Sequence, residues 1–171
     1  MHTEKLPEAW LRGPVAGIPA LLQPVAHVLI QSREEIRNYT RDFPGNLLWD
    51  RPAGRASVAF HLQHICGVID RMLTYAEGKS LTEEQFSYLK KEGVMQETIS
   101  LDTLVENAEN KIDEMLQILP EIPSESLTEF RGVGRKQLPS TVLGLLFHAA
   151  EHTQRHIGQM LVSISVVKEQ A

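Results

Sequence analysis

Two histidines four residues apart, His152 and His156, are the residues of this chain best suited to chemistry. They lie in a segment, residues 151–159, that reads as helix from its apolar spacing. Four residues along a helix turn by about 400°, a net rotation of about 40°, and rise by about 6 Å. Both imidazoles therefore leave one face of the helix, close enough to bind a single cation. Neutral imidazole is the commonest metal ligand in proteins, so the pair predicts a metal site.

A third ligand has to come from another helix. His148 continues the stripe, but residues at i and i+8 on one helix are about 12 Å apart and cannot hold the same ion. His61 and His64, on an earlier helical stretch, are the candidates, and only one of them is needed. Three imidazoles with an open fourth position are typical of a catalytic zinc site rather than a structural one. An ion would also satisfy core-directed histidines, since a buried polar group without a partner costs about 1–3 kcal/mol.

A second pattern overlaps the first. His148, Glu151 and His152 match the H-x-x-E-H arrangement of inverted zinc peptidases, in which the glutamate is the general base. Such a site needs a further acidic ligand much later in the chain. Among residues 153–171 the sole acid is Glu169, in the tail, so we interpret the match as chance.

Composition and charge restrict the class of protein. The 171 residues are 42% hydrophobic and 23% charged, as in an ordinary globular protein long enough to bury a core. A net charge of −5 without a cluster of Lys and Arg argues against nucleic acid as a partner. The segment Met1–Lys5 lacks the character of a signal peptide, and no apolar run reaches about 18 residues. We expect a cytoplasmic protein that binds neither nucleic acid nor membranes.

The single cysteine, Cys66, excludes an internal disulfide and a thiolate cluster for zinc. It stands two positions after His64, about 200° around the helix. We therefore expect Cys66 to be a packing residue that faces away from an ion bound by His64.

Proline and glycine are concentrated in three segments, residues 6–17, 44–54 and 120–139, which we expect to be the joints of the fold. Between these joints the apolar residues recur at helical spacing and strand patterns are almost absent. The apolar stripes of the four expected long helices cover residues 21–39, 58–73, 101–119 and 142–166.

Capping residues define several helix ends. Ser57 is the expected N-cap of the second long helix, and Ser140 that of the last. A capping-box pattern at residues 82–85 predicts a short extra helix that Gly93 would close. Residues 129–135 have the composition of a small hairpin.

These elements predict an all-α fold, a four-helix bundle with a short extra helix and an irregular N-terminal arm. The connections between the long helices are long enough for crossovers, so the order need not be simple up-down-up-down. We expect a single domain over residues 1–171, with the arm at 1–17 and the bundle at 18–168.

The two histidine segments, residues 57–65 and 152–159, resemble the DinB-like superfamily, which includes the bacillithiol- and mycothiol-dependent transferases. The resemblance extends over roughly residues 19–167. It implies a divalent ion, zinc or nickel, at one end of a four-helix bundle with crossover connections, and it implies a homodimer. It also implies the ligand set: His64, which directly precedes Ile65, together with His152 and His156. His61 and His148 then lie beside the ligands or in the pocket.

The resemblance implies a metal-dependent thiol transferase, in which the ion activates a low-molecular-weight thiol for attack on an alkyl halide or an epoxide. A metal-dependent hydrolase and a non-enzymatic, stress-associated metal-binding dimer are the alternatives. A fourth protein ligand, such as His27, His61 or an acid, would favour the non-enzymatic protein. Arg71 and Arg155 are candidates for binding the thiol or are ordinary salt-bridge partners. The arm with Trp10 could dock on a partner subunit or over the site.

Overall fold

The computed structural model describes residues 6–171, and the expectation for Met1–Lys5 lies outside the described residues. Helices dominate the described chain, which confirms the all-α prediction. The elements in chain order are α1 (Gln23–Thr40), α2 (Val58–Ala76), α3 (Glu83–Lys91), α4 (Leu101–Ile118), β1 (Phe130–Val133), β2 (Leu138–Thr141) and α5 (Val142–Gln170).

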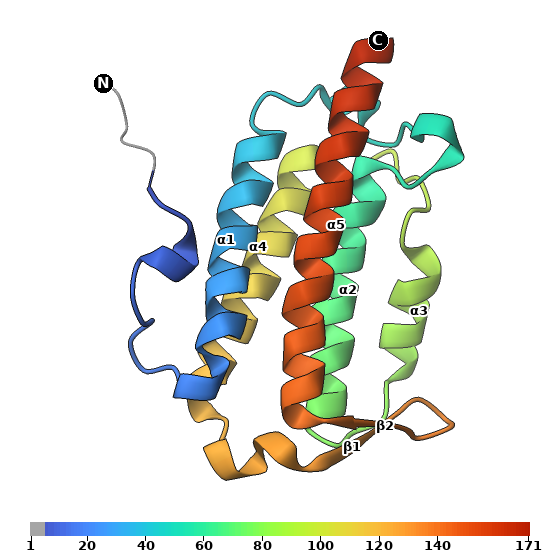
Figure 1. The fold of residues 1–171 in the computed structure, drawn as a ribbon. Coiled ribbons are helices and arrows are strands. Elements are labelled where there is room, and N and C mark those ends of the chain that lie inside the picture. Colours follow the sequence, from blue (N-terminus) through green and yellow to red (C-terminus); the bar gives the residue numbers. More distant parts are fainter. Residues whose placement is uncertain (1–5) are drawn as a thin grey trace.

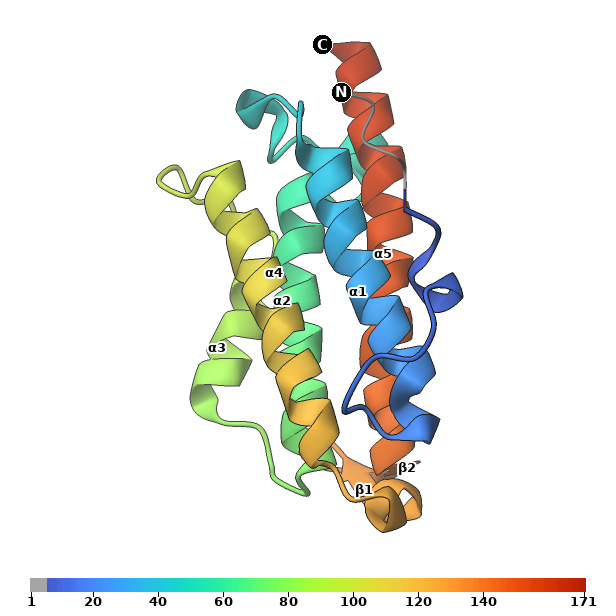
Figure 2. The ribbon, with the colours of Figure 1, turned by 90° about the vertical axis from the view of Figure 1, so that its left-hand side faces the viewer.

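The four long helices form a bundle in which each packs mainly against two others. α5 packs against α1 and α2, and α4 packs against the same two helices (Figure 1). α1 and α5 run in one direction and α2 and α4 in the other, so two of the neighbouring pairs are parallel. Parallel neighbours require long connections. The connection that carries α3 along the outside joins the parallel neighbours α2 and α4, and the connection between α1 and α2 crosses one end of the bundle to join two antiparallel helices (Figure 2). The predicted bundle with crossovers and a short extra helix is confirmed.

Most of the predicted helix ends are correct. The side chain of Ser57 accepts a hydrogen bond from the backbone N–H of Phe60 and caps α2. Thr82 and Gln85 form the complete capping box of α3. Gly93 follows the last residues of α3 with a φ of 78°, a backbone conformation that favours glycine.

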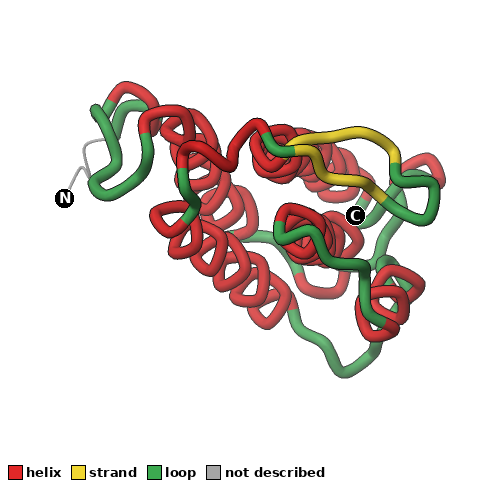
Figure 3. Tube along the Cα trace, turned by 90° about the horizontal axis from the view of Figure 1, so that it is seen from below, coloured by secondary structure: helices red, strands yellow, loops and turns green. Residues whose placement is uncertain are grey.

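The predicted cap of the last helix is wrong by one residue. Thr141, not Ser140, accepts the hydrogen bond from the backbone N–H of Gly144. Ser140 belongs to β2, because the hairpin is longer than predicted and its second strand runs directly into α5. The strands pair antiparallel from Phe130 opposite Thr141 to Val133 opposite Leu138, across one end of the bundle (Figure 3).

The core lies between the four long helices, where the apolar stripes meet. Leu21 was expected in the first stripe but is 63% exposed. It lies in a 3-10 turn, Ala20–Leu22, that precedes α1, so the buried stripe begins at Leu22. The largest fully buried side chains are Leu22, Leu29, Ile36, Leu62, Ile65, Ile69, Ile112, Met115, Leu119, Leu127, Leu146 and Ile157.

The described part of the predicted arm, residues 6–17, contains a single 3-10 turn, Ala9–Leu11. It lies along α1 (Figure 2). Arg12 forms an ion pair with Glu34 at 2.6 Å, and the backbone N–H of Ala9 donates to Gln31 at 3.0 Å. Trp10 is left 61% exposed. Among the described residues, no helix is both long and apolar enough to cross a membrane.

We expect Thr141→Ala to lower the free energy of unfolding by about 1 kcal/mol, because it removes the side-chain cap of α5. Ser140→Ala is the matched control and should change it by less than about 0.5 kcal/mol. Urea unfolding followed by circular dichroism measures both. Equal losses in the two variants would mean that the hairpin, rather than the cap, stabilises the start of α5.

Candidate metal centre

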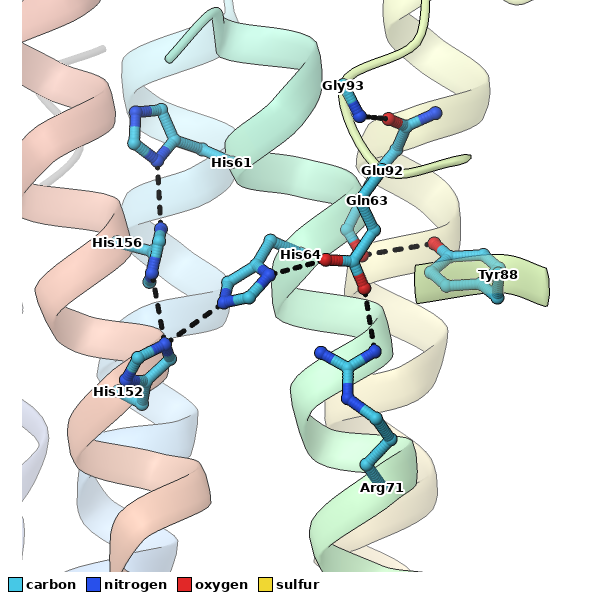
Figure 4. Close-up of polar contacts among 9 residues, drawn as sticks. All are labelled: His61, Gln63, His64, Arg71, Tyr88, Glu92, Gly93, His152 and His156. Atoms are coloured by element: carbon cyan, nitrogen blue, oxygen red, sulfur yellow. Dashed lines mark hydrogen bonds and ion pairs between the residues drawn. The ribbon is translucent and has the colours of Figure 1, made fainter. Parts of the chain in front are cut away.

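His64 of α2 meets His152 and His156 of α5 across the contact between the two helices (Figure 4). Nε2 of His152 lies 3.1 Å from Nε2 of His64 and 3.1 Å from Nε2 of His156. One nitrogen from each of the three lies within 4.8 Å of the others. Within residues 6–171, no fourth His, Cys, Asp or Glu joins this group.

The spacing of the three nitrogens suits one small cation. Metal–imidazole bonds of about 2.0–2.1 Å in a tetrahedral site place the ligand nitrogens about 3.3 Å apart. Hydrogen bonds between neutral imidazoles cannot satisfy all three nitrogens, since a proton on Nε2 of His152 can be donated to only one of its two neighbours, His64 and His156. Nδ1 of His152 is buried and has no hydrogen-bond partner among the described residues. A cation between the nitrogens would bind the lone pairs that otherwise face one another.

A buried carboxylate holds His64 in the orientation that the group requires. Nδ1 of His64 lies 2.6 Å from one oxygen of Glu92, and Arg71 donates to the other oxygen at 2.7 Å. The Glu92 side chain is only 3% exposed. Because a carboxylate only accepts hydrogen bonds, Nδ1 of His64 carries the proton and Nε2 is left to face His152. Metal-ligating histidines commonly have a carboxylate in this position, which fixes the tautomer and the ring orientation.

The end of α3 and the loop that follows it place Glu92 through contacts with α2. The Tyr88 hydroxyl donates to the backbone carbonyl of Gln63 at 3.1 Å, and the side-chain oxygen of Gln63 accepts from the backbone N–H of Gly93 at 2.7 Å. Gly93 lies against Phe60, where a Cβ atom would approach the ring to 2.9 Å. The Phe60 ring in turn stacks on His64, with centroids 5.2 Å apart, and covers the imidazole with an apolar surface.

Burial keeps three of the histidines neutral. It lowers the pKa of His61 to about 4, that of His152 to about 4 and that of His156 to about 3, and the neighbouring imidazoles lower them further in the same direction. An imidazole has to be deprotonated to bind a metal. At neutral pH these rings are therefore in the form that binds cations.

The comparisons with known proteins agree with this architecture. The family model of the DinB superfamily matches residues 28–160, which include all three histidines of the group. The chain belongs to the DinB superfamily. The fold is similar to that of a Streptococcus pneumoniae protein in a crystal structure from the Northeast Structural Genomics Consortium, with a TM-score of 0.62. The two sequences are 16% identical, and the superposition covers 85% of this chain and 88% of the other. At that identity it shows a shared fold. The search of curated proteins gave no match.

Within this DinB bundle, the two other candidate histidines lie next to the group on either side. Nδ1 of His61 is 3.0 Å from Nδ1 of His156, and the His61 side chain is buried. The His148 ring lies 4.9 Å from that of His152, centroid to centroid, with its side chain 47% exposed. Together with Glu151 and His152, His148 could form a second, more exposed group of potential ligands.

The two candidate arginines are both ion-paired. Arg71 is 8% exposed and bound to Glu92, so it acts through the carboxylate that holds His64. Arg155 is bound to Glu151 one turn earlier on α5, with its side chain 52% exposed. The Glu151 carboxylate, which would be the general base of the overlapping peptidase pattern, forms an ion pair with Arg155.

Sequence reasoning missed Glu92, which lies 28 residues after His64. The sequence pointed to Glu92 only indirectly. The capping box and Gly93 predicted the two ends of α3, and Glu92 is the residue at the carboxyl end of this helix, directly before Gly93. Cys66 is 8% exposed within the apolar core, and burial raises the pKa of its thiol to about 11. The prediction that Cys66 is a packing residue is therefore confirmed.

We expect the metal-free DinB protein to lose stability as the pH falls from about 6.5 towards 5. Histidines of the unfolded chain take up protons near pH 6.5, whereas His61, His152 and His156 remain neutral in the folded state until about pH 4 or below. The unfolded state therefore binds more protons in this window, and acid favours it. The measurement is the urea midpoint in the presence of a chelator at several pH values.

His61→Leu is the control for this pH dependence, because it removes one of the three titrating rings from the folded protein. Its midpoint should fall less steeply between pH 6.5 and 5 than that of the parent. A midpoint that is flat over this range in the parent protein would contradict the assignment of neutral buried rings.

Proposed function

We propose that His64, His152 and His156 bind one divalent cation, zinc or nickel, through their Nε2 atoms. The observation that carries this proposal is the position of the His152 Nε2 atom, 3.1 Å from Nε2 of both His64 and His156, with His64 held by Glu92. Three protein ligands leave a fourth position open for a small molecule, as in catalytic zinc sites.

We propose further that the centre serves a metal-dependent thiol transferase. A divalent ion held there supplies a Lewis acid that lowers the pKa of a thiol or a water at the open position. In the transfer reaction the thiol loses its proton, its sulfur forms a bond to carbon, and the carbon–halogen bond of an alkyl halide or a carbon–oxygen bond of an epoxide breaks. A leaving halide departs as the anion, and an opened epoxide oxygen takes up a proton from solvent.

The side chains around the histidines have supporting roles. Glu92 holds the proton of His64 on Nδ1 and thereby fixes which nitrogen faces the ion. With the ion on Nε2 of His156, Nδ1 of His156 would keep its proton and donate it to Nδ1 of His61, 3.0 Å away. Phe60 covers one face of His64 and excludes water from it. These contacts fix the ligands before any substrate arrives, so the site is preorganised for binding.

The same centre would support metal-dependent hydrolysis if water occupies the fourth position. It would have a non-enzymatic, stress-associated metal-binding role if nothing reacts there.

We further propose a cytoplasmic homodimer, in which the Trp10 arm provides part of the contact. The support for the arm's role is the 61% exposure of Trp10 on a segment that packs along α1.

We expect the parent protein to bind one zinc or nickel ion per chain and the double variant His152→Ala/His156→Ala to bind none. Two of the three ligands are then missing, and one imidazole cannot hold the ion against solvent. Isothermal titration calorimetry and metal analysis after dialysis measure the stoichiometry. His27→Ala is the control, since His27 contacts the backbone carbonyl of Gly13 and not the group. Full occupancy in the double variant would place the ion elsewhere.

Glu92→Gln should weaken metal binding by about 10- to 100-fold, because the His64 ring loses the carboxylate that fixes its tautomer. Glu84→Gln, in the helix that precedes Glu92, removes the same charge and should leave the affinity unchanged. Equal affinity in the parent and in Glu92→Gln would show that α2 alone orients His64.

We expect metal-dependent turnover of a low-molecular-weight thiol with an alkyl halide or an epoxide, and we expect His64→Ala to abolish this activity. A panel of such thiols is incubated with the protein loaded with zinc, nickel or manganese, and the loss of free thiol is followed. Absence of thiol binding to the metal-loaded protein at millimolar concentration would reject the transferase and favour hydrolysis or a non-enzymatic role.

A further inference from the structure

A cleft of about 770 Å³ begins beside the histidine group and lies between α5 and the turn before α2. One wall is formed by Pro52–Gly54 and the residues that follow it, and the other by α5 from Gly158 to Val166. His61 also lines it. The volume is in the range of pockets that bind small organic molecules.

The cleft shares a helix face with the histidine group. Gln159 and Ser163 line the cleft and follow His156 by three and seven residues, the spacing that keeps side chains on one face of α5. Three residues of helix rise by about 4.5 Å. A molecule in the cleft would therefore lie within a turn or two of the metal ligands.

The lining is mostly apolar and includes one arginine, Arg55, that has no ion-pair partner within residues 6–171. Val162 and Val166 of α5 face Pro52 and Ala56 across the cleft. Arg55, an exposed residue, also lines the cleft, and its guanidinium makes no hydrogen bond or ion pair with any residue of the described chain 6–171. The second arginine of the lining, Arg155, is already neutralised by Glu151.

His61 connects the cleft to the histidine group. If Nε2 of His156 binds the ion, Nδ1 of His156 keeps its proton and donates it to Nδ1 of His61, 3.0 Å away (Figure 4). The proton of neutral His61 is then on Nε2. As His61 lines the cleft, this N–H is a hydrogen-bond donor available to a bound molecule.

We infer that the cleft binds an amphipathic carboxylate, with its apolar body between Val162, Val166 and Pro52 and its anionic group on Arg55. A guanidinium in an apolar cleft, without a carboxylate partner among the described residues, matches the anionic group of an apolar ligand. Binding of such a molecule does not require the ion. Its assignment as the acceptor of the transfer reaction rests on the proposed function.

Calorimetric titration of the full chain with decanoate tests this inference, with decanol as the neutral ligand of the same length. Decanoate should bind more tightly than decanol. Arg55→Met should weaken decanoate binding roughly tenfold and leave decanol binding unchanged, because only the anion uses the guanidinium. Arg41→Met controls for the lost charge, since Arg41 is bound to Asn38 away from the cleft.

Gly158→Leu fills the cleft without disturbing the core. No atom lies within 4 Å of a Cβ built at Gly158, and leucine favours the helix more than glycine does. Both ligands should lose binding in this variant. Ser165→Leu is the control, because Ser165 is exposed on the same helix and does not line the cleft.

The metal-free protein and His64→Ala separate this inference from the proposed function. Decanoate binding that persists in both, and is lost in Gly158→Leu, supports the cleft whatever the fate of the metal site. Decanoate binding that requires metal and survives Gly158→Leu would mean that the carboxylate binds the ion, and would overturn the inference. Failure of both ligands to bind, with a change of mass in Gly158→Leu by light scattering, would assign the cleft to a contact between chains and overturn it too.

Discussion

The packing of α2 against α5 is the constraint on which the candidate centre depends. The distance of 3.1 Å between His64 and His152 exists only while these two helices keep their register, because a slip of one residue along α2 would turn His64 by about 100°. The register is held by apolar side chains on both helices that are fully buried, including Leu62, Ile65 and Ile157. The distances within the histidine group are therefore set by the apolar contact between α2 and α5.

The short helix α3 gives the centre its second constraint. A buried carboxylate is costly unless it is paired and hydrogen-bonded on both oxygens. Glu92 meets this condition, with Arg71 on one oxygen and His64 on the other. Removing any one of the three leaves a buried polar group unpaired, so the network favours a single arrangement. This explains how a helix outside the bundle can determine the orientation of a ring inside it.

The relation between the histidine group and the cleft follows from helix geometry. The face of α5 that carries His152 and His156 continues into the wall of the cleft, and His61 touches both. The candidate metal centre and the apolar cleft are thus placed next to each other by one continuous stripe of side chains.

The bundle and the pair His152 and His156 can be predicted from the sequence. Apolar periodicity fixes which face of each helix is buried, and the i, i+4 pair on α5 follows from helix geometry alone, so both can be deduced locally. The choice of His64 over His61 came from the family resemblance. The role of Glu92, the position of the α5 cap at Thr141 and the existence of the cleft became evident from the folded structure alone. Each of these depends on how segments distant in sequence pack together, which no local pattern encodes.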